Sequence, residues 1–161
     1  KRYHPLLVTL HWLTLILLFA ANAFSEGEGR RSTIDIHMIL GVVLLVVIVT
    51  RLIVRLTTKR PAWKDTGNKY LNMLGEFVHW AMYLVIFLIL GMGGYMAFSR
   101  NLIGSLLGSG AVLRAPRIIS AVHHLSWFLI VLLLFAHIAG ALYHQFIIKD
   151  NLLSRMWFGK R

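Results

Sequence analysis

The last long apolar stretch of the chain, residues 118–148, most strongly limits how the chain can fold. Its 31 residues include no Lys, Arg, Asp or Glu. At about 1.5 Å of rise per residue, a helix of this length is long enough to cross the roughly 30 Å hydrocarbon core of a bilayer. Because lipid offers the backbone no hydrogen-bond partners, such a segment is expected to be a transmembrane helix.

Three more apolar stretches precede this one, and together they predict four spanning helices at about residues 5–24, 36–56, 70–98 and 117–148. Charged residues make up 14% of the chain, hydrophobic residues 58%, and the mean hydropathy is +0.70. A soluble domain carries about 25% charged residues, so this composition excludes a water-soluble fold. The helices leave no length for a soluble domain, and residues 1–161 are expected to form a single all-α membrane domain. Apolar pairs near residues 102–107 also suggest a short helix lying in the membrane interface.

The Lys and Arg residues are unevenly distributed over the ends and loops of the chain. Twelve lie in the N-terminus, the second loop and the C-terminal tail, and five lie in the first and third loops. Since cationic residues favour the cytoplasmic side, both termini are expected in the cytoplasm, with the four helices running up-down-up-down. The net charge of +11 then reflects orientation and contact with anionic membrane lipid rather than nucleic-acid binding.

The last apolar stretch carries four histidines, and three of them are His123, His137 and His144. At about 100° per residue, His123 and His137 return to within roughly 40° of one face and lie about 21 Å apart along the helix. A lone histidine in a membrane helix is commonly just a polar residue paired with a neighbour. A buried imidazole is costly in lipid, however, and two in register leave room for two flat macrocycles stacked along a bundle.

Other helices supply histidines at the same two depths. His37 opens the second helix at the level of His123, near the outer face, so these two residues make one candidate pair of iron ligands. His137 lies nearer the cytoplasm, and both His11 in the first helix and His79 in the third are close enough in depth to be its partner. Helix geometry alone leaves that choice open.

The remaining residues of coordinating type fit these layers less well. His144 lies two turns nearer the cytoplasm than His137. His124 points about 100° away from the helix face that carries His123 and His137, and His4 precedes the first helix. A metal-binding bundle would bring carboxylates to the same layer, and only Glu76 is available there. Because the chain has no cysteine, it cannot itself hold an iron–sulfur cluster or thioether-bound haem. The expected cofactors are two non-covalent b-type haems.

The residues around these histidines resemble those of the bacterial cytochrome b561 family, and the resemblance covers nearly the whole chain. The most diagnostic stretch is the tail that follows the last helix, which has the pattern KDN-x-L-x-R-M. The motifs that carry the resemblance are His11-Trp12, Ile36-His37, Val78-His79 with Met82-Tyr83, His123-x13-His137, and LYHQFIIKDNLLSRM at residues 142–156.

The resemblance implies a four-helix, di-haem protein of the bacterial inner membrane. Positions matching the family's axial ligands are His11 and His137 for the inner haem, and His37 and His123 for the outer haem. His79 would then lie beside the inner haem without binding iron.

Two further points follow from the family pattern. His79 would hold a haem propionate or relay protons with Glu76. The family often has Glu at the position of His124, and the loop of residues 99–117 is short for the family.

The resemblance also implies a function, because some family members are superoxide oxidases. The first hypothesis is a superoxide:ubiquinone oxidoreductase that passes electrons from the periplasmic side through both haems to quinone near the cytoplasmic side. The second is a cytochrome b carrier between the quinone pool and a separate dehydrogenase or periplasmic redox protein. A third is a cofactor-free bundle, such as a transporter or assembly factor, with histidines that sense pH.

Cationic residues at the two ends of the bundle are candidates for substrate contacts. Arg100, Arg114 and Arg117 in the third loop would attract superoxide, or they bind lipid headgroups. At the cytoplasmic side, a quinone carbonyl could be bound by His144 together with Arg51 or Arg55. Arginines at helix ends also commonly extend to the membrane surface without binding a ligand.

Overall fold

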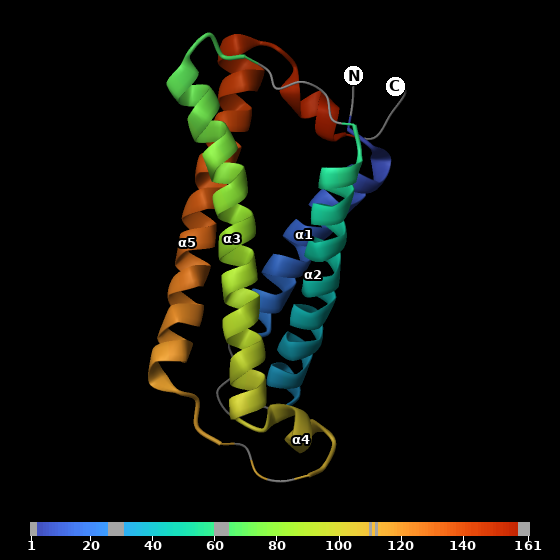
Figure 1. Cartoon of the computed structure of the whole chain (residues 1–161), viewed down its shortest axis with the longest axis vertical. Helices are drawn as coiled ribbons and strands as arrows, with labels where there is room; N and C mark the ends of the chain where they lie inside the picture. Colours follow the sequence, from blue (N-terminus) through green and yellow to red (C-terminus); the bar gives the residue numbers. More distant parts are fainter. Residues whose placement is uncertain (1–2, 26–30, 60–64, 110, 112, 158–161) are drawn as a thin grey trace.

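The computed structural model describes residues 3–25, 31–59, 65–109, 111 and 113–157. The described residues are mainly helical and contain no strand. The long helices are α1 (Pro5–Ala23), α2 (Arg31–Thr57), α3 (Lys69–Ser99) and α5 (Arg117–Leu142), with the short α4 (Leu102–Leu106) between α3 and α5 (Figure 1). Four helices of the described part are long and apolar enough to cross a membrane. The prediction of an all-α, four-helix membrane bundle is therefore confirmed.

Two helix boundaries differ from the sequence-based expectation. The second helix begins at Arg31 rather than near residue 36, because a polar first turn precedes its apolar part. The last helix ends as an α-helix at Leu142 and continues as a π-helical turn, η1 (Tyr143–Ile148). A 3-10 helix, η2 (Leu152–Met156), then follows in the tail. The expected short helix of the third loop is present as α4.

Local sequence signals explain where three long helices begin. The side chain of His4 accepts a hydrogen bond from the backbone N–H of Leu6, and Pro5 occupies the first turn of α1. Asn68 caps α3 by accepting from the N–H of Tyr70 at 2.9 Å. Pro116 directly precedes α5 in an extended conformation. Because proline disfavours a helical conformation of the residue before it, α5 does not begin earlier.

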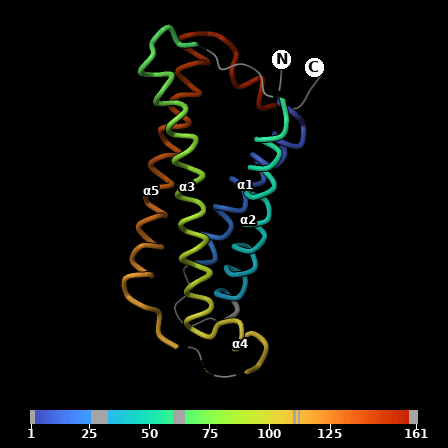
Figure 2. Tube along the Cα trace, in the orientation of Figure 1, coloured from blue at the N-terminus to red at the C-terminus, as the bar shows by residue number. Residues whose placement is uncertain are grey.

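The bundle consists of two helical hairpins, one formed by α1 and α2 and the other by α3 and α5. α1 packs closely along α2, α3 packs closely along α5, and α2 meets α3 over a smaller area. Figure 1 shows α1 and α2 on one side of the molecule and α3 and α5 on the other, and Figure 2 traces the same arrangement. The marked chain ends, the end of α2 and the start of α3 lie at one end of the bundle, whereas α4 lies at the opposite end. Groups placed between the hairpins would therefore hold the two halves together.

The core of the bundle lies midway along the helices. Leu44, Ile48 and Ile130 are its most completely buried side chains. Ile130 stands seven residues from both His123 and His137, so the core separates two histidine layers. Many large apolar side chains on the outside are exposed, as expected for helices whose outer faces contact lipid.

Candidate functional site

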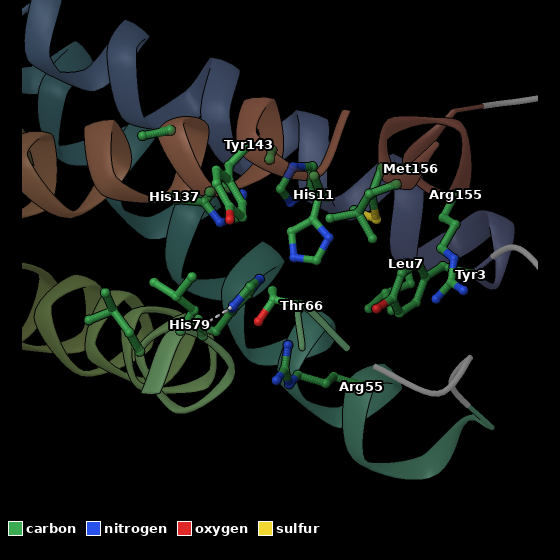
Figure 3. Close-up of a pocket in the computed structure, with 18 of the residues that line it drawn as sticks. Tyr3, Leu7, His11, Arg55, Thr66, His79, His137, Tyr143, Arg155 and Met156 are labelled. Carbon is green, nitrogen blue, oxygen red and sulfur yellow. Dashed lines mark hydrogen bonds between the residues drawn. The ribbon is translucent and has the colours of Figure 1, made fainter. Parts of the chain in front are cut away.

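Three histidines from three helices meet near the end of the bundle that holds the chain termini. The ring centroid of His137 on α5 is 6.0 Å from that of His11 on α1 and 4.9 Å from that of His79 on α3. All three side chains point into the same space (Figure 3). The inner layer predicted from the sequence is thus assembled, and both possible partners of His137 lie beside it.

The inner histidines line a cavity of about 780 Å³ between the two hairpins. The predicted quinone-site residues Arg51, Arg55 and His144 line the same cavity. Gly140, one turn beyond His137 on α5, also lines it, and a Cβ added there would meet nothing within 4 Å. A flat group could therefore approach the α5 backbone closely at this point.

The cavity is strongly cationic. The guanidinium of Arg51 lies over the ring of Tyr83 at 5.4 Å, and that of Arg55 lies over Trp80 at 5.2 Å and over Tyr83 at 5.6 Å. Arg55 is only 9% exposed. None of the described residues that line the cavity is acidic. Because a buried positive charge is unfavourable without an anion, the cavity is suited to a ligand that carries carboxylates.

A second histidine pair lies toward the opposite end of the bundle. The ring centroids of His37 on α2 and His123 on α5 are 6.1 Å apart. Nδ1 of His37 lies 2.7 Å from the carbonyl oxygen of Ala21, and Nδ1 of His123 lies 2.9 Å from that of Ile89. Since a carbonyl only accepts, each Nδ1 carries the proton and donates it. Each Nε2 is therefore left with the lone pair that a metal ligand needs.

A glycine makes room for the outer pair. A Cβ added at Gly93 would lie 3.2 Å from Cε1 of His123, closer than side chains normally approach. The absence of a side chain at Gly93 therefore lets the His123 imidazole lie against α3. The cluster of Gly91, Gly93 and Gly94 in the sequence indicates close packing or a bend, but the contact of Gly93 with His123 depends on how α3 packs on α5.

The ring separations allow a test of whether haem iron fits each pair. A metal–imidazole bond is about 2 Å, and the ring centre lies roughly 1 Å beyond the nitrogen, so one iron between two imidazoles separates the ring centres by about 6 Å. The His11–His137 and His37–His123 distances of 6.0 and 6.1 Å fit this value. The His79–His137 distance of 4.9 Å is too short. The geometry therefore favours the ligand choice that the family resemblance implied.

One contact of the inner layer has to change for iron to bind. Nη2 of Arg51 lies 2.8 Å from Nδ1 of His11. Arginine can only donate, so Nδ1 of His11 accepts and its proton lies on Nε2. Coordination through Nε2 requires the other tautomer. The guanidinium of Arg51 must then turn toward another acceptor, and a haem propionate in the same cavity would be a suitable one.

The C-terminal tail closes the cavity at the end that holds the chain termini. Nε1 of Trp12 donates to the backbone oxygen of Met156 at 3.0 Å, and the indoles of Trp12 and Trp157 meet edge to face. The backbone N–H of Tyr3 donates to the oxygen of Arg155 at 3.4 Å. Tyr3, Arg155 and Met156 line the cavity (Figure 3). Helix periodicity does not place these residues at the cavity, and the KDN-x-L-x-R-M motif of the tail is the one sequence signal in this segment.

Other residues singled out from the sequence lie away from the two histidine pairs. Glu76 is exposed and does not line the cavity. His124 is exposed, with its ring 5.8 Å from that of His123, and His4 caps α1.

The cationic residues of the third loop lie at the end of the bundle that holds α4. Nε of Arg100 donates to the backbone oxygen of Leu113 at 3.2 Å, and the backbone N–H of Leu113 donates to the oxygen of Arg100 at 2.9 Å. This paired contact fastens the loop to the end of α3. Arg114 and Arg117 are exposed.

The chain is similar to known proteins over nearly its whole length. The family described as "Prokaryotic cytochrome b561" matches residues 2–159. A protein from Yersinia pestis named "Probable superoxide oxidase CybB" is 28% identical and covers 100% of this chain and 98% of its own length. A protein from Escherichia coli (strain K12) named "Cytochrome b561 homolog 2" is 26% identical and covers 97% of this chain and 91% of its own.

The family match covers nearly every residue of the chain, including all the histidines discussed above. Its members are multi-pass membrane proteins of bacteria that bind b-type haem and transfer electrons. The chain therefore belongs to the prokaryotic cytochrome b561 family.

Proposed function

We propose that this protein moves electrons across the membrane through two b haems, from superoxide at the periplasmic side to ubiquinone near the cytoplasmic side. The observation that carries the proposal is the pair of histidine layers, one on either side of the core, with ring separations of 6.0 and 6.1 Å. We assign His11 and His137 to the inner haem and His37 and His123 to the outer haem. Residues 1–161 act as one cytochrome b unit, with both termini in the cytoplasm.

The chain provides the surroundings that such cofactors need. When bound, the two haems would supply one-electron transfer between the two ends of the bundle. His11 and His137 would hold the inner haem and His37 and His123 the outer haem, and two imidazole ligands to each haem would leave no room for oxygen to bind the metal. Between the layers, Leu44, Ile48 and Ile130 exclude water and keep the dielectric low.

At the outer end, the chain presents cations to an anionic donor. Arg114 and Arg117 are exposed, and Arg117 stands six residues before His123 at the start of α5. Positive charge on the approach to a site raises the local concentration of a small anion and its rate of encounter. These arginines would therefore guide superoxide to the edge of the outer site, where an electron is given up and oxygen leaves.

At the inner end, the chain offers donors to a quinone. Arg51, Arg55 and His144 face one cavity, and the two arginines are held by the rings of Tyr83 and Trp80. A guanidinium or imidazole N–H can donate to a quinone carbonyl oxygen. His79 in the same cavity is placed to hold a propionate. Reduction of one quinone requires two electrons, supplied by two superoxide ions, and two protons from the cytoplasmic side.

Pulse-generated superoxide tests the proposal directly. The purified holoprotein with ubiquinone-1 should form quinol at about 10⁸ M⁻¹ s⁻¹ in superoxide, near the diffusional limit. The rate should fall steeply as salt is added, because steering by Arg114 and Arg117 is screened. A holoprotein that reduces quinone no faster than the uncatalysed mixture overturns the superoxide assignment.

The runner-up function uses the same two haems with a protein donor. The similarity to a relative named only as a cytochrome b561 homologue favours keeping it. A cytochrome b carrier would exchange electrons with quinol and with a separate dehydrogenase or periplasmic redox protein. Haems that are reduced by quinol, show no response to superoxide and co-purify with a redox partner would select this function.

A further inference from the structure

We propose that Asp150 is a positioning residue that prepares His144 to transfer protons to the quinone. The inference rests on the proposed reduction of quinone at the inner cavity. It gives a chemical role to the KDN segment of the tail, which the haem ligands do not explain.

The two side chains form a close pair beside the cavity. Nδ1 of His144 lies 2.8 Å from Oδ2 of Asp150, and the two side chains are 15% and 10% exposed. Because a carboxylate only accepts, the shared proton lies on Nδ1 of His144. Since His144 also lines the cavity, its Nε2 is the atom left to exchange a proton with a bound ligand.

The backbone between His144 and Asp150 departs from a regular α-helix, and this departure brings the two side chains together. In a continuing α-helix, residue 150 would lie six positions beyond His144 and roughly 240° around the axis, facing away from it. The chain instead forms the π-helical turn η1, and the N–H of Asp150 donates to the backbone oxygen of His144 at 3.2 Å. Lys149 and Asn151, on either side of Asp150, both adopt left-handed conformations, with φ of 58°.

These unusual backbone conformations indicate a local structure that surrounding contacts hold in place. A non-glycine residue in the left-handed region is unfavourable unless surrounding contacts hold it there, and π-helical turns occur often at functional sites. Here the unusual backbone places the Asp150 carboxylate against the imidazole of His144. Oδ1 of Asp150 is buried and finds no hydrogen-bond partner within the described part of the chain. Among the described residues, the side-chain partner of the Asp150 carboxylate is therefore His144.

The rest of the cavity supplies positive charge but no other acid. No described lining residue is Asp or Glu, so Asp150 reaches the cavity only through His144. Quinone reduction needs protons as well as electrons, and arginine cannot release a proton in proteins. Among the residues that the structure describes, the other titratable or charged ones that face this space are Tyr3, His11, Arg51, Arg55, His79, Tyr83, His137, Tyr143 and Arg155.

The proton step can be written with atoms and charges balanced. Doubly protonated His144 donates its Nε2 proton to a reduced quinone oxygen and becomes neutral, while Nδ1–H stays bound to the Asp150 carboxylate. The imidazole then takes a proton from water at the cytoplasmic side and donates a second time. Quinone thus gains two electrons and two protons to become quinol, and two superoxide ions are oxidised to oxygen.

The experiment measures quinone reduction without superoxide. The haems of the purified holoprotein are reduced anaerobically with dithionite and mixed rapidly with ubiquinone-1, and their reoxidation is followed by absorbance. Asp150→Asn should slow reoxidation by about 100-fold, the scale of lost general acid catalysis, with haem content and haem spectrum unchanged. The slowed step should show a larger solvent deuterium isotope effect than the wild type, which a purely structural role would not produce.

Two further variants make the result specific. Asp150→Glu keeps the carboxylate and should recover most of the rate. Asp65→Asn is the matched control, because Asp65 is another cytoplasmic-side carboxylate bound to a neighbouring side chain, Asn72 at 2.6 Å, but it contacts no cavity histidine. Its reoxidation rate should equal that of the wild type.

The possible outcomes separate the two proposals. Wild-type haems that quinone does not reoxidise overturn both the quinone function and the role of Asp150. Rapid reoxidation in the wild type and in Asp150→Asn alike overturns only the role of Asp150. An Asp150→Asn variant that is slow but shows no added isotope effect, with no recovery in Asp150→Glu, would mean that Asp150 holds the tail fold and does not position His144.

Discussion

The two histidine layers have nearly the same ring separation but differ in what holds their imidazoles. In the outer layer, backbone carbonyls of Ala21 and Ile89 accept from Nδ1 of the two rings. In the inner layer, Nδ1 of His11 faces the guanidinium of Arg51 instead. The outer pair is thus ready to bind iron through Nε2, whereas the inner pair is coupled to the charges of a large cavity.

Because of this difference, the two layers are expected to give bound haems different reduction potentials. Backbone carbonyls are neutral and fixed by the helices, so the outer layer would hold a bound haem in one geometry. Two guanidinium groups, those of Arg51 and Arg55, line the inner cavity, and their positive charge would disfavour the oxidised, more positive iron of a haem bound there. The inner haem should therefore have the higher reduction potential, which favours electron flow from the outer end to the inner end.

The largest expected effect comes from removing one ligand of each layer. His123→Ala should lose the outer haem, and His137→Ala should lose the inner haem, because each iron then keeps one imidazole. Either variant should bind one haem per chain and reduce quinone from superoxide more than about 100-fold more slowly. Haem content and low-temperature EPR check this prediction, and loss of both haems from one variant would show that the layers are not independent.

His79→Ala is the matched control for the inner ligand. His79 lies in the same cavity as His137, but its ring is only 4.9 Å away, too near for an iron between them. This variant should therefore keep both haems, with the low-spin EPR signals of both retained. If His79→Ala lost the inner haem while His11→Ala kept it, the ligand assignment of the inner layer would be wrong.

A smaller effect is expected from the inner-layer cations. Arg51→Gln would remove a positive charge from the inner cavity, together with the charge-assisted hydrogen bond of about 1.5–3 kcal/mol that Arg51 would make to a haem propionate. The inner haem should bind about 10- to 100-fold more weakly, and its potential should fall by about 60 mV, while the outer potential is unchanged. A redox titration of both haems provides the measurement. An equal fall in both potentials would contradict the proposed difference between the layers.

The smallest effect is expected at the outer layer. Gly93→Ala would place a Cβ 3.2 Å from Cε1 of His123, so the imidazole must shift by a few tenths of an ångström. We expect a loss of about 1 kcal/mol in stability and a small change in the EPR signal of the outer haem only. Gly91→Ala on the same helix meets nothing within 4 Å and should leave that signal unchanged. Altered inner-haem signals in Gly93→Ala would count against the assignment of His123 to the outer layer.

Much of the fold followed from the sequence because membrane helices reveal themselves by length and hydropathy. The depth of each histidine could be counted from helix ends, which brought His37 to the level of His123. Counting could not choose between His11 and His79, because both distances to His137 depend on how the hairpins pack.

Other features of the inner cavity depend on departures from regular helix geometry and on side-chain packing. The pairing of His144 with Asp150 requires a π-helical turn that periodicity does not predict. The stacking of Arg55 on Trp80 arises where α2 meets α3, so hydropathy gives no signal for it. The sequence indicated these arginines as candidates, and only the packed structure places them in the cavity with the histidines.

The most direct test of the account is the amount of haem bound by the pure protein. Pyridine haemochrome absorbance and total iron, measured against protein from amino-acid analysis, should give two b haems per chain. Redox titration of the same sample should resolve two potentials, one for each histidine layer. A single haem per chain, or a colourless protein, would contradict the two-layer account.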